Sequence, residues 1–101
     1  MKIDGKTKIT GIFGYPVEHT FSPYFHNAGY EYLGLDFVYL PFCVHPEDLG
    51  KAVSSLRVFN IAGINVTVPH KEKIMKYLRI LTSLGHFTLD IEGDEIRKLS
   101  V

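Results

Sequence analysis

Residues 61–71 read IAGINVTVPHK, and this stretch decides the class of fold to expect. Its first eight residues, Ile61–Val68, are rich in β-branched side chains, which predicts a strand, and Pro69 ends that strand. A helix is predicted to start at Lys71 and to continue to Leu78. The stretch therefore predicts a strand that leads through a short turn into a helix, the unit from which α/β folds are built.

Two units of the same kind precede it along the chain. Gly34 is well placed to end the first helix, because glycine adopts the left-handed conformation that commonly closes helices. The order β-α-β-α-β-α predicts an α/β fold, a three-layer sandwich with a mostly parallel sheet. The predicted elements are a strand over Ile9–Phe13, a helix over Tyr24–Leu33, a strand over Asp36–Val44, and a helix after His45 with Leu49, Ala52, Val53 and Leu56 on its apolar face.

The strand Asp36–Val44 is apolar on both of its faces, which is typical of a strand covered by helices on each side. Cys43 lies in this run, and we interpret it as a small buried hydrophobic residue. It is the only cysteine of the chain, so neither an internal disulfide nor a zinc site of several cysteines is possible within one copy.

The last stretch has a different pattern. Phe87–Ile91 and Ile96–Val101 flank a turn sequence that contains Gly93, which predicts a β-hairpin, with a frayed tail as the alternative. We expect residues 1–78 to form the main domain. Residues 79–101 would be a divergent tail, whose hairpin could complete the same domain.

Length and charge narrow the function. A chain of 101 residues is long enough for one compact domain. Eleven basic and eleven acidic residues cancel, and no basic stripe is present, which argues against nucleic-acid or anionic-membrane partners. No apolar run approaches the roughly 20 residues that span a bilayer, and the polar N-terminus does not resemble a signal peptide. We therefore expect a cytoplasmic location.

The first candidate binding stretch follows the first strand. Thr20 and Ser22 are two residues apart and precede a predicted helix, whose free N–H groups and dipole favour an anion such as a carboxylate. The alternative is that Ser22 only caps the helix and Thr20 only lies in a turn. The residues alone leave both interpretations open.

The second candidate stretch is the one quoted above. Asn65 and Thr67 share one face of the predicted strand, and Lys71 follows one turn later, so an amide, a hydroxyl and an ammonium gather at the carboxyl end of the strand. Ligands of open α/β sheets bind at that edge. A lysine there can bind a substrate oxygen or accept a proton, although a lysine after a proline is commonly a solvated surface charge.

Other site types find no support in the sequence. The five histidines are scattered and no pair has clear metal-ligand spacing, so we expect no metal. The chain has neither a G-x-G-x-x-G motif nor a P-loop, so we expect no nucleotide cofactor site in it.

Taken together, the two stretches resemble the signature of the shikimate dehydrogenase family, which includes the shikimate/quinate dehydrogenases. The family's N-terminal domain carries a Gly-x-Pro loop that leads to Ser-x-Ser-Pro-x-x-His-Asn, and later Gly-x-Asn-Val-Thr-x-Pro-x-Lys. The matching residues here are Gly14–Pro16, Thr20–Asn27 and Gly63–Lys71, with Thr20 in place of the first serine. The resemblance covers roughly residues 8–78.

The resemblance implies a role for each matching residue. Thr20 and Ser22 would bind the carboxylate of shikimate, Asn65 and Thr67 would shape the pocket and contact the substrate, and Lys71 would be the catalytic lysine. The implied activity is NADP-dependent shikimate 3-dehydrogenation, an oxidoreductase step of the shikimate pathway of aromatic amino acid biosynthesis.

The resemblance ends near Arg79. In the family, a Gly-Ala-x-Asn-Thr strand and an Asn-Thr-Asp-Gly segment follow, whose Asp pairs with the catalytic lysine. Here Leu84–Thr88 echoes the first without its asparagine, nothing echoes the second, and no Rossmann domain is present. We therefore expect a truncated substrate-binding domain that is inactive alone. The alternatives are a non-catalytic binding module for shikimate-like acids and a self-associating assembly module, with a homo-oligomer as the possible partner state.

Overall fold

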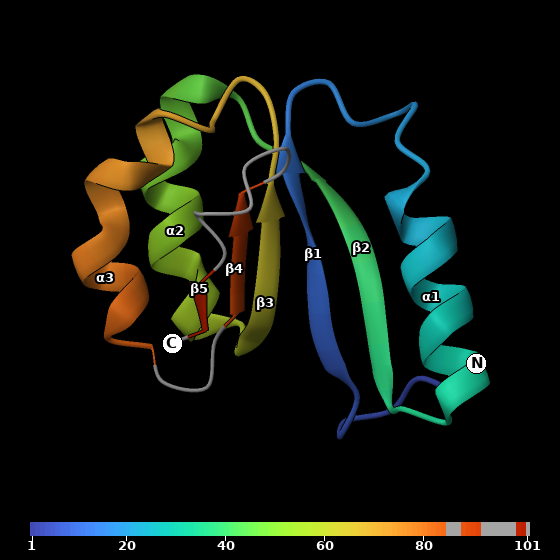
Figure 1. Ribbon diagram of the computed structural model, residues 1–101. Coiled ribbons are helices and arrows are strands. Elements are labelled where there is room, and N and C mark those ends of the chain that lie inside the picture. The colour runs from blue at the N-terminus through green and yellow to red at the C-terminus, as the bar shows by residue number, and fades with distance from the viewer. Residues whose placement is uncertain (85–87, 92–98, 101) are drawn as a thin grey trace.

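The computed structural model describes residues 1–84, 88–91 and 99–100 of the chain, and Figure 1 shows their arrangement. Strands and helices alternate through most of the sequence. The α-helices and strands are β1 (Lys8–Gly14), α1 (Ser22–Leu33), β2 (Phe37–Cys43), α2 (Leu49–Val58), β3 (Ile61–Val66), α3 (Leu78–Thr82), β4 (Thr88–Ile91) and β5 (Leu99–Ser100); two 3₁₀ turns are η1 (Pro46–Asp48) and η2 (Lys73–Tyr77).

One five-stranded sheet runs through the molecule in the order β2-β1-β3-β4-β5. The pairs β1–β2, β1–β3 and β3–β4 are parallel, and β5 alone among the described strands is antiparallel to its neighbour. The register pairs Gly14 with Cys43 and Phe13 with Val66, so β1, β2 and β3 end at the same edge. This edge is at the top of Figure 1. The predicted, mostly parallel sheet is confirmed.

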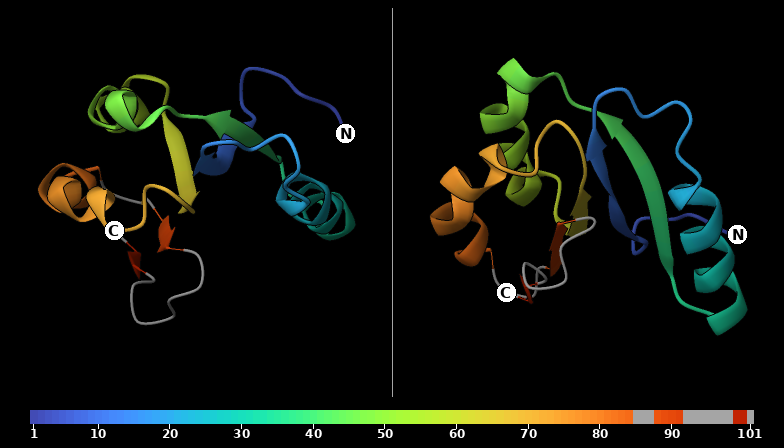
Figure 2. Two further views of the ribbon diagram at one scale, coloured as in Figure 1. Left: turned by 90° about the horizontal axis from the view of Figure 1, so that it is seen from above. Right: turned by 45° about the horizontal axis from the view of Figure 1, so that its top comes forward.

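Helices cover both faces of the sheet, which confirms the three-layer sandwich. Figure 2 shows α2 and α3 on one side and α1 on the other. The apolar core lies between the sheet and α2, α3 and η2, and α2 turns its predicted apolar face into it. The buried members of this core are Phe13, Val44, Leu49, Val53, Leu56, Ile64, Val66, Ile74, Leu81, Leu89 and Ile91.

The helix α1 is attached differently, because none of its twelve residues, all of them described, is fully buried. Asn27 forms two hydrogen bonds to the backbone of β2: its Nδ2 donates to the Tyr39 carbonyl (3.0 Å), and its Oδ1 accepts from the Tyr39 N–H (2.8 Å). The hydroxyls of Tyr30 and Thr10 are 2.8 Å apart. The helix ends as predicted, with Gly34 in the left-handed conformation at φ 68°. Polar bonds, together with ring contacts of His26 with Tyr39 and of Tyr30 with Phe37, therefore connect α1 to the sheet.

One prediction about the second strand holds only in part, and another is wrong. The two faces of β2 are covered along part of its length: Val38 and Tyr39, which point to opposite faces, are buried, whereas Leu40 and Pro41 are exposed. Cys43 is exposed as well, not buried. The reason is that β2 has a neighbouring strand on one side only, while α1 packs over part of it. A proline within this strand fits an edge position, because edge strands tolerate a missing N–H donor.

The predicted helix after Pro69 is also different in detail. The strand β3 ends at Val66, and the helix predicted from Lys71 forms two pieces, η2 and α3. The chain first passes through tight turns, in which the His70 N–H donates to the Thr67 carbonyl and the Met75 N–H to the Glu72 carbonyl. Such i→i+3 bonds replace the first turn of a regular helix.

The C-terminal strands pair as the predicted hairpin requires. Thr88 pairs with Ser100 and Leu89 with Leu99 in antiparallel register. The turn around Gly93 lies outside the described residues. Leu81 and Leu89 join the same core cluster as the earlier elements, while the domain boundary at residue 78 stays a prediction. Within the described part of the chain, no helix is long and apolar enough to cross a membrane.

Candidate functional site at the carboxyl edge of the sheet

Two loops meet at the edge where β1, β2 and β3 end. The first, residues 15–21, joins β1 to α1, and the second, residues 67–72, joins β3 to η2. The Thr67 N–H donates to the Phe13 carbonyl (3.1 Å), and the Tyr15 N–H donates to the Val68 carbonyl (3.3 Å). The two sequence stretches that were singled out as candidates are therefore brought together by the fold.

Gly14 allows the close approach of these loops. A Cβ atom at this position would lie 2.8 Å from Thr67 Cγ2 and 2.9 Å from Val17 Cγ1, both shorter than real Cβ contacts. Only a residue without a side chain fits here unless the neighbours move. Thr67 is thus packed directly against the start of the first loop.

Thr20 and Ser22 form a local hydrogen-bonded turn. The Ser22 N–H donates to Thr20 Oγ1 (3.2 Å), and both residues are half-buried. The interpretation of Ser22 as the helix cap is wrong, because Ser22 already lies in the first turn and the residue at the cap position is Phe21. Since the Thr20 oxygen accepts the Ser22 N–H, its own O–H remains able to donate to a carboxylate.

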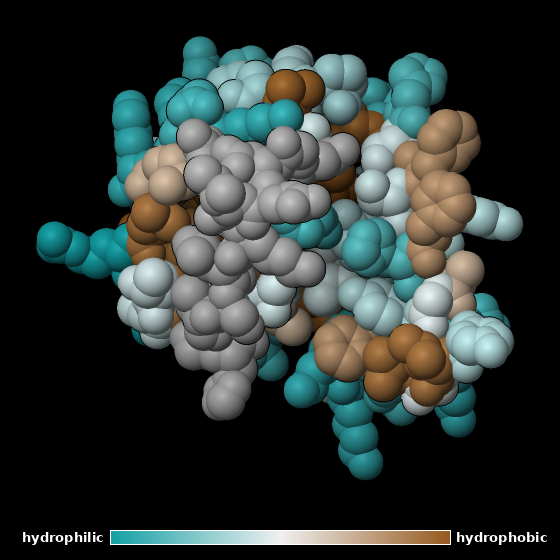
Figure 3. Space-filling view, viewed as in Figure 1, coloured by the Kyte–Doolittle hydropathy of each residue, from teal (hydrophilic) through white to brown (hydrophobic). Residues whose placement is uncertain are grey.

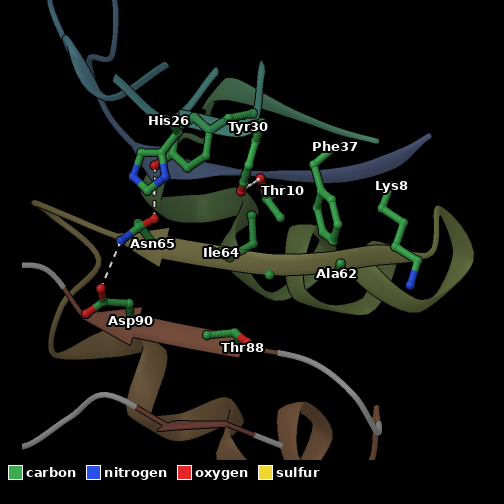
Figure 4. A pocket seen from close by; sticks show the side chains of 12 residues that line it. Lys8, Thr10, His26, Tyr30, Phe37, Ala62, Ile64, Asn65, Thr88 and Asp90 are labelled. Atoms are coloured by element: carbon green, nitrogen blue, oxygen red, sulfur yellow. Dashed lines mark hydrogen bonds between the residues drawn. The ribbon is translucent and has the colours of Figure 1, made fainter. Parts of the chain in front are cut away.

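Asn65 faces a second region, a cleft of about 400 Å³ on the α1 side of the sheet. Its amide is engaged on both sides, as Figure 4 shows: Oδ1 accepts from the Tyr39 hydroxyl (3.0 Å), and Nδ2 donates to Asp90 Oδ2 (3.2 Å). Of the five candidate residues, Asn65 is the one that lines this cleft.

The cleft contains residues that sequence reasoning missed. The His26 ring stacks on the Tyr39 ring, with centroids 4.1 Å apart and planes within 5°. Partial burial lowers the pKa of His26, and the negative charge of Asp90 acts in the opposite direction. Strand alternation was an available signal for Asp90, because it lies between the buried residues Leu89 and Ile91.

Lys71 is half-buried at the end of the second loop and forms no ion pair with any described residue. Its neighbour His70 is fully buried, and its Nε2 lies 2.7 Å from the Val44 carbonyl. Burial lowers the pKa of His70, the Val44 carbonyl opposes that shift, and the charge of Lys73 adds to it. In the sequence of this loop, the half-buried Lys71 thus directly follows a fully buried histidine.

Among the described residues, the first βα turn differs from a dinucleotide-binding turn, and no cluster of metal-ligating side chains is found. In dinucleotide-binding folds the first βα turn is glycine-rich, so that the backbone can approach the pyrophosphate. Here the corresponding loop has Gly14 at its start, and the space beside that residue is filled by Thr67 and Val17. No group of three His, Cys, Asp or Glu side chains gathers anywhere in the described ranges.

Comparison with known proteins gives one consistent result. The family model "Shikimate dehydrogenase substrate binding domain" matches residues 12–86. Shikimate dehydrogenase (NADP(+)) of Thermosynechococcus vestitus is 52% identical over 84 residues, which are 83% of this chain and 29% of that protein. The same enzyme of Methanobrevibacter smithii is 57% identical over 76 residues, which are 75% of this chain and 27% of that protein.

Solved structures agree with the sequence relatives. Shikimate 5-dehydrogenase from Listeria monocytogenes, in complex with shikimate and NAD, has a TM-score of 0.73 and 40% identity over 76% of this chain and 27% of its own. The shikimate dehydrogenase of Aquifex aeolicus has a TM-score of 0.72 and 45% identity, over 74% and 28% respectively. The chain spans between a quarter and a third of the length of these relatives. It belongs to the shikimate dehydrogenase family and corresponds to its substrate-binding domain.

Proposed function

We propose that this chain binds shikimate or a closely related cyclic hydroxy acid at the carboxyl edge of the sheet. Thr20 and Ser22 bind the carboxylate, while Thr67 and Lys71 bind a ring oxygen. The observation that carries the proposal is the pairing of the two loops through Thr67–Phe13 and Tyr15–Val68, because it joins the start of the loop that leads to Thr20 and Ser22 to the loop that leads to Lys71. A relative solved with bound shikimate supports the choice of ligand.

The residue types suit the two ends of such a ligand. Hydroxyl groups donate short, charge-assisted hydrogen bonds to a carboxylate. The Lys71 ammonium carries three donors and no acceptor, so it can bind the oxygen that exchanges hydride in the family's reaction. Asn65 shapes the site from the neighbouring cleft, because both atoms of its amide are already bonded to Tyr39 and Asp90.

We further propose that the 101-residue chain does not transfer hydride by itself. Hydride transfer requires a cofactor held at the reacting carbon, and positioning supplies several kcal/mol of the barrier reduction. Among the described residues, the first βα turn differs from a dinucleotide-binding turn, so residues 1–78 act as the binding domain alone. Incubation with shikimate and NADP should give no NADPH absorbance above that of a heat-denatured sample, and measurable turnover would contradict this.

Matched pairs of variants test the binding site. Ser22→Ala should weaken shikimate binding about tenfold or more, the cost of one hydrogen bond to a charged group. Ser54→Ala is its control, because Ser54 is exposed on α2. Lys71→Met keeps the side-chain stem and removes the ammonium, and should also weaken binding. Its control is Lys51→Met, because Lys51 lies on α2, the helix that also carries Ser54. Equal affinities within each pair, measured by calorimetry, would refute the proposed site.

A second candidate function is self-association through α1. Its outer side exposes large apolar side chains along the right-hand side of Figure 3. The exposed fraction is 74% for Phe21, just before the helix, and 72% for Tyr24, 66% for Phe25 and 90% for Tyr32 within it. Large apolar side chains exposed on one helix are a feature of interaction surfaces. Sedimentation should show mass increasing with concentration, and Phe25→Ser should suppress it; a monomer at all concentrations excludes this role.

A further inference from the structure

His70 is the fully buried polar residue of the described part of the chain, with an exposed fraction of 0%. Its Nε2 lies 2.7 Å from the Val44 carbonyl oxygen. A carbonyl oxygen can only accept, so Nε2 carries the hydrogen and donates it. The other ring nitrogen, Nδ1, is buried and has no hydrogen-bond partner in the described structure. The side chain therefore contributes one directed bond, and one buried acceptor remains unpaired.

That bond closes a ring of hydrogen bonds across the ends of three strands. Gly14 accepts from the Val44 N–H (2.9 Å), which ties β1 to the residue after β2. The Val44 carbonyl then accepts from the His70 side chain, and the His70 N–H donates to the Thr67 carbonyl (2.9 Å). The Thr67 N–H returns to β1 at the Phe13 carbonyl (3.1 Å). His70 is the single member of the ring that takes part through its side chain.

The ring contains or adjoins the parts of the proposed site. Thr67 is a member, Lys71 is the next residue after His70, and Gly14 begins the loop that leads to Thr20 and Ser22. The second loop is connected to β1 by backbone hydrogen bonds alone. The imidazole of His70 adds a hydrogen bond that connects this loop to the residue after β2. A buried polar side chain with an unpaired acceptor is unfavourable for packing alone, because an apolar ring would leave nothing unpaired. This contrast points to the directed bond as the contribution of His70.

We propose that His70 is a positioning residue for the binding site, holding the loop of Thr67 and Lys71 against the ends of β1 and β2 through its bond to Val44. The proposal rests on the proposed function for its effect on binding, whereas its effect on the loop does not depend on any ligand.

Two amide variants test the reach of the side chain. The amide nitrogen of Gln lies about as far from the backbone as Nε2, whereas that of Asn lies near the position of Nδ1 and cannot reach Val44. His70→Gln should keep hydrogen-exchange protection at the Val44 and Thr67 amides, and His70→Asn should lower it about tenfold there. Amides of the β3–β4 pairing, such as Leu89, should change little in either variant.

The same variants are titrated with shikimate. His70→Gln should bind within about threefold of the wild-type affinity, and His70→Asn should bind about tenfold more weakly, as expected for one lost hydrogen bond. Equal hydrogen-exchange protection of the loop in both variants would overturn the proposal. An equal loss of protection throughout the sheet would overturn it too, because His70 would then stabilise the whole fold and not the loop in particular. An imidazole nitrogen spectrum of the wild type with hydrogen on Nδ1 would also overturn it. If the wild type binds no shikimate, the proposed function fails, and the exchange data still decide the role of His70.

Discussion

Replacing Gly14 by alanine should damage the site more directly than any change to its polar residues. The added Cβ would lie 2.8 Å from Thr67 Cγ2, which is 0.6 Å inside the 3.4 Å at which ordinary contact begins, and 2.9 Å from Val17 Cγ1. Both neighbours carry branched side chains with stiff χ1 angles, so they can yield only if the loops move. Overpacking of this kind costs about 1–3 kcal/mol.

The assay compares Gly14→Ala with Gly29→Ala. A Cβ at Gly29, within α1, meets nothing within 4 Å, so that change should raise the free energy of unfolding by about 0.5–1 kcal/mol through helix propensity. In urea denaturation, the midpoint of Gly14→Ala should therefore lie below that of the wild type, and the midpoint of Gly29→Ala above it. Gly14→Ala should also weaken shikimate binding, because Thr67 must move. A Gly14→Ala protein as stable as the wild type, with unchanged affinity, would refute the described contact between the loops.

Two further predictions concern α1 and the histidines. Asn27→Ala should lower the free energy of unfolding by about 1–3 kcal/mol in urea titrations, because two hydrogen bonds to Tyr39 are lost; an unchanged midpoint would show that apolar contacts hold the helix. Stability should also fall as the pH drops below 6.5, the ordinary histidine pKa, because burial holds the pKa values of His70 and His26 below that value. Below pH 6.5 the unfolded chain binds more protons than the folded one. The contribution of the neutral histidines to the free energy of unfolding is therefore complete above pH 6.5, and it is lost as the pH falls toward their pKa in the folded state. Urea midpoints at pH 7.5 and 5.5 measure the difference, which His70→Gln should reduce; a slope unchanged by that variant would contradict the assignment to His70.

Much of the fold could be predicted from local signals. Gly34 gave the end of the first helix correctly, because its left-handed conformation is a backbone property that few other residues share. The alternation of strand and helix patterns gave the parallel sheet and its layers. These features depend on periodicity and turn chemistry within a few residues, which a single sequence contains.

The position of each strand in the sheet could not be predicted in the same way. An apolar strand such as β2 looks the same whether it lies in the centre or at the edge, so Cys43 was expected to be buried and is exposed. Pro41 was the one available signal, because proline within a strand favours an edge. The order β2-β1-β3 results from long-range pairing, which a local pattern does not encode.

The candidate site shows the same division. The meeting of the two candidate loops at one edge can be predicted from the rule that parallel strands end together. The hydrogen bonds of Asn65 could not be predicted, because they depend on the Tyr39 hydroxyl and the Asp90 carboxylate from two other strands. The role inferred for His70 also depends on a contact with Val44, 26 residues away in the chain.

The most direct test of the account is a titration of the isotope-labelled chain with shikimate, followed by amide NMR. The account predicts saturable shifts in both loops, at Thr20, Ser22, Thr67 and Lys71, that fit a single dissociation constant. Shifts confined to the cleft around Asn65 and Asp90, or no shifts up to millimolar ligand, would contradict a binding site at the carboxyl edge of the sheet.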